Sequence, residues 1–528
     1  MKKLLSSLAV VVASFAVVAV AKNSATTPYV PQAVYCLDQT AASAASPLCA
    51  ALPGNIGPDP ALSANGVAYN GIHVKRPQSF NEDVQTPFDN LSWQTFVALN
   101  WTAGKQSAPP EQGLQGTGPR VWETYKRVSH VFGNSPVQAN CSDVPAGIDV
   151  FSIASDGNHN PKARNEEYIE AATGDPLIDV DGNWTLYERR LNDREIAYLT
   201  SPLGKGKGNL MTQGGQSLFI ASGGIVDFPW SPGIGTGAIE IKAAWRILHP
   251  GKDNEKSYYV EHAYLKVAGD LVTGGKQICR KVDLGLVAMH IIQKNPPKQA
   301  DSGLEQQWFW STFEHVNNAP PAVHSCDPVV PQQCTSLTSG SASNCPPAQP
   351  VPPYYSYFDP YCQNCSTNQP PTASSGAPSF VWNATEPYAK SYLTMQNGHA
   401  IGTQVSRCWQ IYWGTNALNT QWRDQLKKIG SVFQNYMLIG TQWGGDLTST
   451  PIPQIPGKGV PTYLSNTAVE TYIQTSYNRN NPGSCVACHQ GATLAAGQPQ
   501  PQSNFSFLPG LADPSLLRRP PINAAAQR

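Results

Sequence analysis

The middle of the chain alternates short apolar runs with turn residues. Between residues 81 and 320, five runs are rich in aromatic and β-branched side chains, and turn-forming residues separate them. These runs are residues 216–225, 238–248, 257–267, 281–293 and 307–316. Runs of this length and composition predict β-strands, so residues 81–320 are expected to form a β-rich body.

Two segments outside these runs have the pattern of helices. Residues 92–99 favour a helix over a strand. From Asn419 onwards, large apolar residues recur at intervals of four and three, which predicts an amphipathic helix ending near Gly440. The apolar residues are Trp422, Leu426, Ile429, Phe433 and Tyr436.

A further helix is predicted near the C-terminus. Thr467 and Glu470 have the spacing of a capping box. Apolar residues then recur on one helical face, at Val469, Tyr472, Ile473 and Tyr477. The sequence Asn-Asn-Pro-Gly at residues 480–483 is expected to end this helix.

The first 21 residues have the features of a secretory signal peptide. Two lysines precede an uncharged apolar run, which ends in the small-x-small sequence Ala19-Val20-Ala21. A membrane anchor is the alternative, but Ala and Ser dilute the run and the cleavage site is good. We therefore expect a periplasmic or secreted protein of a Gram-negative bacterium, without a membrane span once the signal is cleaved.

Composition narrows the class of protein. Charged residues make up 14% of the chain and the formal net charge is zero, so the basic surface that nucleic-acid binding requires is missing. Three regions differ from the body in composition. Residues 22–80 are expected to form an irregular arm, residues 321–378 a Cys/Pro/Ser-rich excursion, and residues 379–528 a helical lobe.

The cysteines indicate disulfide bonds, because the chain is expected to be exported. There are 12 of them, and ten remain after the pair in the motif described below. Cys36 and Cys49 form a plausible local pair. Five cysteines lie between Cys326 and Cys365, in sequence too polar to fold by apolar burial alone. Disulfides are expected to staple this excursion, with one bridge leaving it for a partner such as Cys408.

Cys362 and Cys365 have the spacing of a redox motif. No strand-to-helix pattern surrounds them, and Tyr, Pro and Asn are their neighbours instead. A structural disulfide is therefore favoured over a thioredoxin-like site.

The sequence Cys485-Val486-Ala487-Cys488-His489 matches the attachment motif of c-type haem. Two thiols on one helical turn reach the two vinyl groups on one edge of the porphyrin, and the adjacent histidine donates a nitrogen to the iron. We therefore expect one covalent haem c, with Cys485 and Cys488 as thioethers and His489 as the proximal ligand. The expected fold class is α+β, a β-rich body with a C-terminal helical lobe that carries the haem.

A sixth iron ligand must come from upstream, because residues 490–528 contain no methionine. His315 ranks first, since it ends a predicted strand where the chain turns. His290 ranks second because it lies in an apolar strand, where a histidine is more often a core residue. Met437 ranks third, ahead of no ligand at all. Met289 is more often core than ligand and His399 is expected to be solvated, so neither is ranked.

Four charged residues lie in aromatic-rich segments and are candidates for pairing with haem propionates. They are Glu123, Lys126, Lys242 and Arg246. Surface salt bridges are the alternative, which we favour for at least two of them.

Several stretches together resemble a known group of proteins. They include residues 91–101, 121–126, 241–246, 310–318 and 440–443, with the motif at 484–489 and residues 504–507. This set is similar to large exported bacterial proteins described only as cytochrome c family proteins. The resemblance covers roughly residues 88 to 510. It implies one haem and a large body that is not a cytochrome, and it implies no reaction.

Two functions follow from these expectations. Electron transfer through a single covalent haem fits the motif and the compartment, with an unknown redox partner. A haem-dependent oxidoreductase, peroxidase-like or oxygenase-like, would instead explain the large body, which would hold a small-molecule substrate. A binding or scaffold protein is the third class. Electron transfer ranks first.

The motif generates a direct test of attachment. Replacing Cys485 and Cys488 together by alanine is expected to abolish the haem band on a denaturing gel stained for haem peroxidase activity, because both thioethers are lost. The wild-type band is the control. Haem that stays with the denatured double variant would contradict covalent attachment through this motif.

Overall fold

The structure is a computed structural model, and it describes most of the chain after residue 81. The described residues are 48–53, 82–133, 135–162, 164–170, 174–202, 208–229, 237–295, 307–326, 345–362, 365–372, 380–444, 459–461, 463–474, 477–478 and 481–514. The predicted signal peptide and most of the predicted arm lie outside them. No helix within these ranges is long and apolar enough to cross a membrane.

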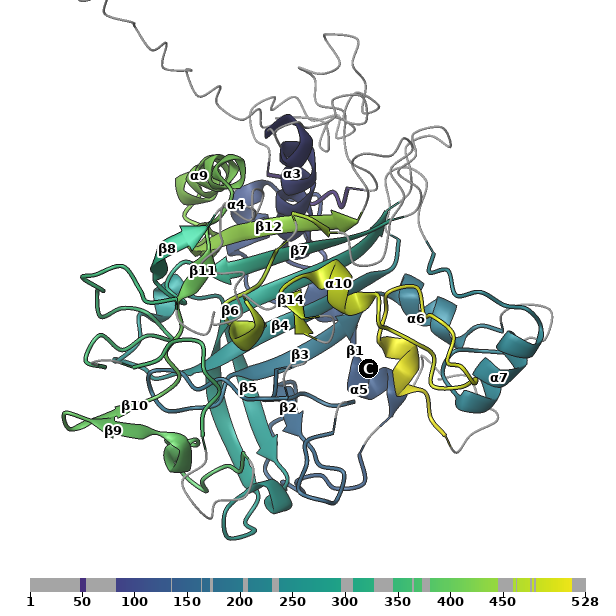
Figure 1. Ribbon diagram of the computed structural model, residues 1–528, viewed down its shortest axis with the longest axis horizontal. Helices are drawn as coiled ribbons and strands as arrows, with labels where there is room; N and C mark the ends of the chain where they lie inside the picture. The colour runs from purple at the N-terminus through teal and green to yellow at the C-terminus, as the bar shows by residue number, and fades with distance from the viewer. Residues whose placement is uncertain are drawn as a thin grey trace, which may run out of the picture.

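A nine-stranded sheet forms the centre of this described part (Figure 1). Its main path runs β1-β3-β4-β6-β7-β12-β13, and β5 pairs with β6 while β2 pairs with β5. The strands are β1 (Lys126–Arg127), β2 (Asp149–Ile153), β3 (Leu186–Leu191), β4 (Ile239–Leu248), β5 (Val260–Val267), β6 (Ile278–Asn295), β7 (Gln307–His315), β12 (Tyr436–Gly444) and β13 (Gly459–Val460). All pairings on the main path are antiparallel.

Four of the five predicted strands are confirmed as β4 to β7. The prediction for residues 216–225 is wrong, because α7 (Gln213–Ala221) is a helix there. The Thr212 hydroxyl caps it by accepting from the Gly215 amide. The Gln216 side chain donates to the carbonyls of Leu210 and Pro509. These contacts outweigh the modest strand preference of the apolar residues.

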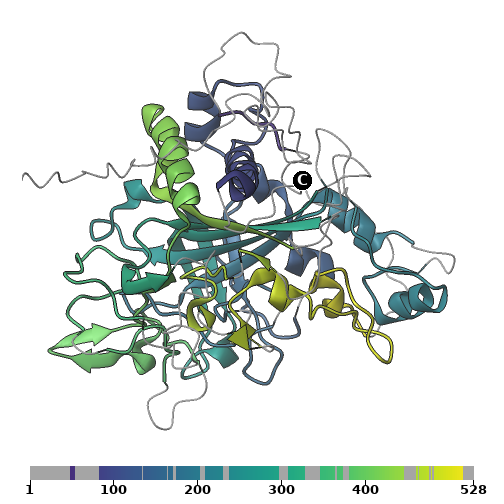
Figure 2. The same cartoon turned by 45° about the horizontal axis from the view of Figure 1, so that its top comes forward.

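Two helices cover one face of the sheet, α3 (Glu82–Leu99) and α9 (Trp413–Lys428). Figure 2 shows them on the side of the sheet opposite the C-terminal segment. Phe96 of α3 stacks on Phe313 of β7 at 4.1 Å between ring centroids, and Trp93 stacks on Trp422 of α9 at 5.9 Å. The helix predicted over residues 92–99 is confirmed and begins ten residues earlier.

The second predicted helix ends earlier than its apolar pattern indicates. Helix α9 stops at Lys428, and Gly430 then takes a φ of +69°, a conformation that favours glycine. Phe433 is buried in a short 3₁₀ turn, and Tyr436 is buried as the first residue of β12. The apolar spacing of four and three therefore continues across a helix end, and the prediction of helix to Gly440 is wrong.

The C-terminal segment lies against the other face of the sheet (Figure 2). It includes α10 (Cys485–His489), which Ser484 caps by accepting from the Ala487 amide. The helix predicted after Thr467 is replaced by turns and a 3₁₀ turn, Thr471–Ile473. The predicted capping box joined Thr467 and Glu470. In the structure the Glu470 carboxylate accepts the Asn466 amide instead, and no α-helix follows among the described residues before α10.

The region predicted as one helical lobe, residues 379–528, is divided between two faces of the sheet. Helix α9 lies on the α3 face, β12 is a strand of the sheet itself, and α10 lies on the opposite face. The β-rich body is thus confirmed, while the described residues do not form the separate helical lobe. The smaller elements are α4 (Pro110–Gln115), α5 (Val128–Phe132), α6 (Asp193–Thr200), β8 (Pro321–Cys326), β9 (Thr394–Gln396), β10 (His399–Ile401), β11 (Arg407–Trp409), β14 (Tyr477–Asn478) and β15 (Asn481–Pro482).

Disulfides join distant parts of the body. Cys141 pairs with Cys279, a bond that the sequence did not single out. Cys345 of the excursion pairs with Cys408, as predicted, and Cys362 pairs with Cys365. Cys49 is disulfide-bonded, whereas its predicted partner Cys36 and the side chains of Cys326 and Cys334 lie outside what the structure describes.

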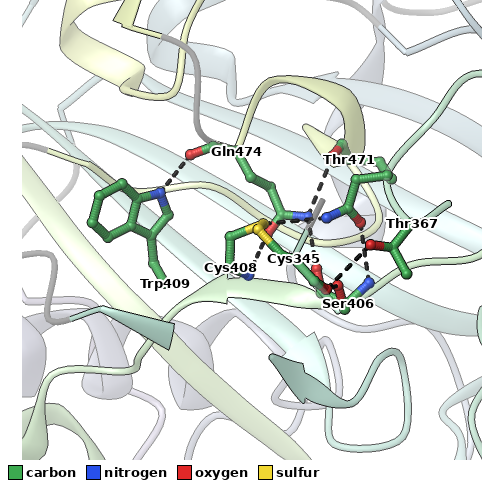
Figure 3. The surroundings of a disulfide bond; sticks show 8 residues. Cys345, Thr367, Ser406, Cys408, Trp409, Thr471 and Gln474 are labelled. Atoms are coloured by element: carbon green, nitrogen blue, oxygen red, sulfur yellow. Dashed lines mark hydrogen bonds between the residues drawn. A yellow bond between two sulfur atoms is a disulfide. The ribbon is translucent and has the colours of Figure 1, made fainter. Parts of the chain in front are cut away.

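The Cys345–Cys408 disulfide supports the segment that precedes α10 (Figure 3). The Gln474 side chain accepts the Cys408 amide at 3.1 Å and donates to the Ser406 carbonyl at 3.0 Å. The Trp409 indole donates to the Gln474 carbonyl. The disulfide therefore fixes the strand that holds this segment in place.

A buried ion pair fixes the same segment to the sheet. Glu314 of β7 and Arg407 of β11 make two hydrogen bonds, at 3.1 and 2.7 Å, and their side chains are 0% and 7% exposed. Glu314 also accepts both the amide and the hydroxyl of Thr467, each at 2.6 Å. All of these bonds converge on one carboxylate that has no access to water.

Replacing Arg407 by methionine is expected to lower the free energy of unfolding by about 3–5 kcal/mol, because it leaves the Glu314 charge buried without its cation. Denaturant unfolding measures this loss. Arg280→Met is the control, since Arg280 is 48% exposed in its pair with Glu386, and we expect a loss below about 1 kcal/mol. Equal losses in the two variants would show that burial does not set the strength of the first pair.

Candidate functional site

The motif Cys485 to His489 forms the single turn of α10, at one side of the sheet. The Gln442 side chain of β12 accepts the Val486 amide at 2.8 Å and contacts the Ser484 hydroxyl at 3.2 Å. This contact satisfies an amide at the start of the helix that has no partner within it. Among the described cysteines, Cys485 and Cys488 are the two free thiols, and both are half-buried.

The ring of His489 is oriented by a backbone carbonyl. Its Nδ1 donates to the carbonyl of Phe505 at 2.6 Å. A histidine that ligates a metal commonly donates its other ring nitrogen in this way, which leaves Nε2 with the lone pair. Burial lowers the pKa of His489 to about 4, although the bond to Phe505 acts in the opposite direction. The ring is therefore neutral at physiological pH, as metal binding requires.

The carbonyl of Phe505 is held in place by the sheet. Asn504 and Phe505 have φ of +53° and +67°, values that residues other than glycine rarely adopt. Two residues of the sheet stabilise this turn. The Trp308 indole donates to the Asn504 carbonyl at 2.8 Å, and the buried Lys294 ammonium donates to the Asn504 side chain at 2.6 Å. The strained turn thus places a carbonyl beside His489.

A cavity of about 600 Å³ lies next to the motif. Cys485, Cys488 and His489 line one part of it. The sheet lines another part. The rest is lined by residues before and after α10, namely Leu464, Val469, Glu470, Ile473, Phe507 and Leu508, and by Pro161, Glu167, Ile169, Glu170 and Gly174. We call this space the α10 cavity.

The sheet presents two rows of side chains to the α10 cavity. Strand register places Arg189 opposite Lys242, Lys242 opposite His290, and His290 opposite Thr312. The second row, two residues along each strand, contains Leu191, Glu240, Ile292 and Trp310. Because alternate residues of a strand share a face, both rows point away from α3 and α9.

The structure brings His290, and not His315, to the motif. His290 lines the cavity and is 8% exposed. Its Nε2 is buried and makes no hydrogen bond within the described part, and it lies 3.4 Å from the Glu470 carboxylate. Burial would raise the pKa of Glu470, but the nearby His290 and Lys242 outweigh it and the pKa is lowered.

His315 lies elsewhere in the body, which reverses the predicted order of the two histidines. Its ring stacks on Tyr258 at 4.1 Å. Nε2 donates to the Ser257 carbonyl at 2.9 Å and Nδ1 accepts the Asn317 amide at 3.2 Å, so both ring nitrogens are used. Its side chain does not line the α10 cavity. The end of a strand was therefore a poor guide to a ligand position.

The methionines and His399 are also outside the cavity. Met437 lies on β12 opposite Glu314, and not in the helix that was predicted to end near Gly440. Met289 is in the core between the sheet and the helices, 4.0 Å from the Asn100 side chain. The exposed ring of His399 stacks on Tyr361 at 4.4 Å.

Lys242 alone of the four candidate propionate partners lines the α10 cavity. The Glu123 carboxylate accepts the Arg120 amide and the Tyr259 hydroxyl, and Lys126 is exposed on β1. Arg246 pairs with three aspartates, at 2.6 to 3.4 Å. Arg246 therefore forms salt bridges, but it is 3% exposed, so they are buried and not the surface salt bridges of the alternative.

Five charged residues of the cavity were missed in the sequence, and a sixth was misread. The five are Arg189, Arg190, Glu167, Glu170 and Glu240, and the sixth is Glu470, which was read only as a helix cap. Arg189 pairs with Glu167 at 3.1 Å. Burial raises the pKa of Glu170 to about 8, and burial together with Glu240 raises the pKa of Glu195 well above its usual range. A local sequence pattern could not reveal the charged residues of the cavity, because they differ from surface residues only in being buried.

The residues of the site fit a covalent haem. Two free thiols, an oriented histidine and a second histidine whose Nε2 makes no hydrogen bond and lies 3.4 Å from Glu470 meet at one cavity. Trp310, whose ring lies 5.6 Å from that of His489, also has a buried indole nitrogen without a partner in the described chain. Polar atoms buried without partners are costly, and a ligand with polar groups would offset that cost.

Comparison with protein families, with curated proteins and with solved structures finds no match to this chain.

The buried His315 predicts a loss of stability in mild acid. Burial lowers the pKa of His315 from 6.5 to about 4, so between these values the unfolded chain binds a proton that the folded chain does not. The free energy of unfolding should therefore fall as the pH falls from about 6.5 to about 4. His315→Gln is expected to flatten this slope in denaturant titrations. His399→Gln, at an exposed ring, is the control, and equal slopes for wild type and His315→Gln would contradict the assignment.

Proposed function

We propose that this chain is an exported single-haem c-type cytochrome that transfers electrons through a haem bound to Cys485, Cys488 and His489. The observation that carries the proposal is the meeting of two free thiols, His489 and His290 at one cavity. The haem supplies reversible one-electron chemistry, and the protein supplies its attachment, its ligands and its surroundings.

His489 is the proximal ligand in this proposal. Its bond to the Phe505 carbonyl fixes the tautomer that leaves Nε2 available, and the Lys294 and Trp308 contacts hold that carbonyl. Such outer contacts keep the ring orientation constant when the charge on the iron changes. That constancy suits a group that only exchanges electrons.

His290 is the distal ligand in this proposal. Its side chain extends from the centre of the sheet, where β4 and β7 flank β6 on both sides. A ligand on a central strand is positioned more rigidly than one on a loop. Two neutral imidazoles support both ferric and ferrous iron, so the iron would have no open position for a substrate.

The half-buried motif supports the same function. Cys485, Cys488 and His489 are each neither fully buried nor fully exposed, and the adjacent Phe507 is 43% exposed. The edge of a haem attached there would be near the surface, where a redox partner can approach. The disulfide bonds of the body fit an oxidising compartment, as the predicted signal peptide does.

A haem-dependent oxidoreductase is the second candidate. The cavity is lined by titratable side chains besides His290, among them Lys242, Glu170 and Glu470. If His290 were not a ligand, these groups could act as acids and bases beside an open iron. Unlike the first candidate, this function requires a five-coordinate or water-bound iron.

The optical spectrum of the purified protein tests the proposal. The ferric and ferrous wild-type forms are expected to be low-spin and unreactive towards carbon monoxide. His290→Ala should give a high-spin ferric spectrum and a ferrous form that binds carbon monoxide, because one ligand is lost. His315→Ala is the control for histidine loss at a buried site and should keep the low-spin spectrum. A high-spin wild type would favour the oxidoreductase instead.

A further inference from the structure

The α10 cavity has two ends that differ in chemistry. The end at α10 carries the thiols, and α10 is held by Gln442 of β12 and lies beside Trp310 of β7. Moving across the sheet from β7, the first row presents His290 on β6, Lys242 on β4 and Arg189 on β3. The cations Lys242 and Arg189 therefore start from the strands farther from β7, together with the carboxylate of Glu167, which pairs with Arg189, and those of Glu170 and Glu470, which act on Lys242.

Strand spacing sets the scale of this row. Neighbouring strands lie about 4.8 Å apart, so His290, Lys242 and Arg189 start about 5, about 10 and about 14 Å from β7. In a haem, the two vinyl groups leave one edge of the porphyrin and the two propionates leave the opposite edge, with the iron between them. The order thiols, histidine, cation along the sheet matches the order vinyl edge, iron, propionate edge.

Lys242 is a buried cation without a close anionic partner among the described residues. It is 9% exposed, and its ammonium lies 4.9 Å from the centre of the Tyr187 ring. It makes no hydrogen bond or ion pair within 4 Å to any part of the chain that the structure describes. Burial lowers the pKa of Lys242, although the charges of Glu470, Glu167 and Glu170 act in the opposite direction from beyond 4 Å. A carboxylate in direct contact would stabilise the buried ammonium further.

The nearby carboxylates of the chain each contact another group. Glu167 pairs with Arg189 at 3.1 Å, and Glu470 accepts the Asn466 amide at 2.9 Å. One oxygen of Glu170 accepts the Thr471 amide at 3.3 Å, and its other oxygen has no partner among the described residues. These contacts leave Lys242 as the cavity's cation without a close carboxylate among the described residues.

We propose that Lys242 binds a propionate of the haem and thereby orients the porphyrin with its iron over His290. The inference rests on the proposed function, because it needs the covalent haem. Lys242 is a positioning residue here. Its ammonium donates to the propionate carboxylate, while the Tyr187 ring below it stabilises the charge from the opposite side.

Infrared spectroscopy tests this contact directly. The haem is labelled with carbon-13 in its propionate carboxyl groups by growth on labelled 5-aminolevulinic acid, and redox-induced difference spectra are recorded. In Lys242→Met the labelled carboxylate band should shift from its wild-type position, because a charge-assisted hydrogen bond is lost. Lys242→Arg should largely restore it. The reduction potential of Lys242→Met should also fall, since a buried positive charge favours the reduced iron.

Lys266→Met is the matched control. Lys266 lies on β5 of the same sheet, outside the α10 cavity, and its loss changes the net charge equally. The labelled band should keep the wild-type position. Lys242→Gln replaces Lys242→Met if the latter does not give folded protein. An unshifted band in a Lys242 variant with attached haem would overturn the Lys242 assignment alone, whereas wild-type protein without covalent haem would overturn the proposed function and this inference with it.

Discussion

The alternation of side chains along three central strands is the constraint on which the rest of the structure depends. On β6, Met289 and Ile291 point to the helices, whereas His290 and Ile292 point to the α10 cavity. On β4, Ile241 packs in the helical core and Lys242 faces the cavity. Both faces of the sheet are buried. One face packs in the apolar core, and the other encloses charged side chains inside the protein.

Buried charge explains how the C-terminal segment is held. The segment has few long elements of its own, and it is fixed by polar contacts to side chains of the sheet. Glu314 binds Thr467, Gln442 binds the Val486 amide, and Lys294 binds Asn504. Each contact satisfies a group that would otherwise be buried without a partner. The strands that form the floor of the cavity therefore also position the motif above it.

This arrangement gives the two candidate functions a common origin. His290 lies between Lys242 on the neighbouring strand and Glu470. It could serve a haem iron as a ligand or as an acid–base group. Whether its Nε2 binds the iron distinguishes the two functions. Electron transfer makes the simpler use of the geometry, because Nε2 of His290, which makes no hydrogen bond, would then bind the iron. The large body is also explained in part, since the sheet and its helical layer are what hold His290 and Lys242 rigidly.

The sequence by itself determined the elements whose signals are local. The strands β4 to β7 follow from their composition, and the prediction of a haem attachment motif follows from the spacing of Cys485, Cys488 and His489. The expected disulfide from the excursion to Cys408 followed from counting cysteines in a polar segment.

Only the tertiary structure decided which distant residues meet. His290 and His315 both lie on predicted strands, and their ranking depended on which face of the sheet each one occupies and on what covers that face. The helix α7 was likewise set by contacts with a segment far away in the chain, whereas the end of α9 follows from the local conformation of Gly430. The local sequence determines the spacing of apolar residues within a segment. The partners of a buried polar group come from other strands, so they cannot be predicted from one segment alone.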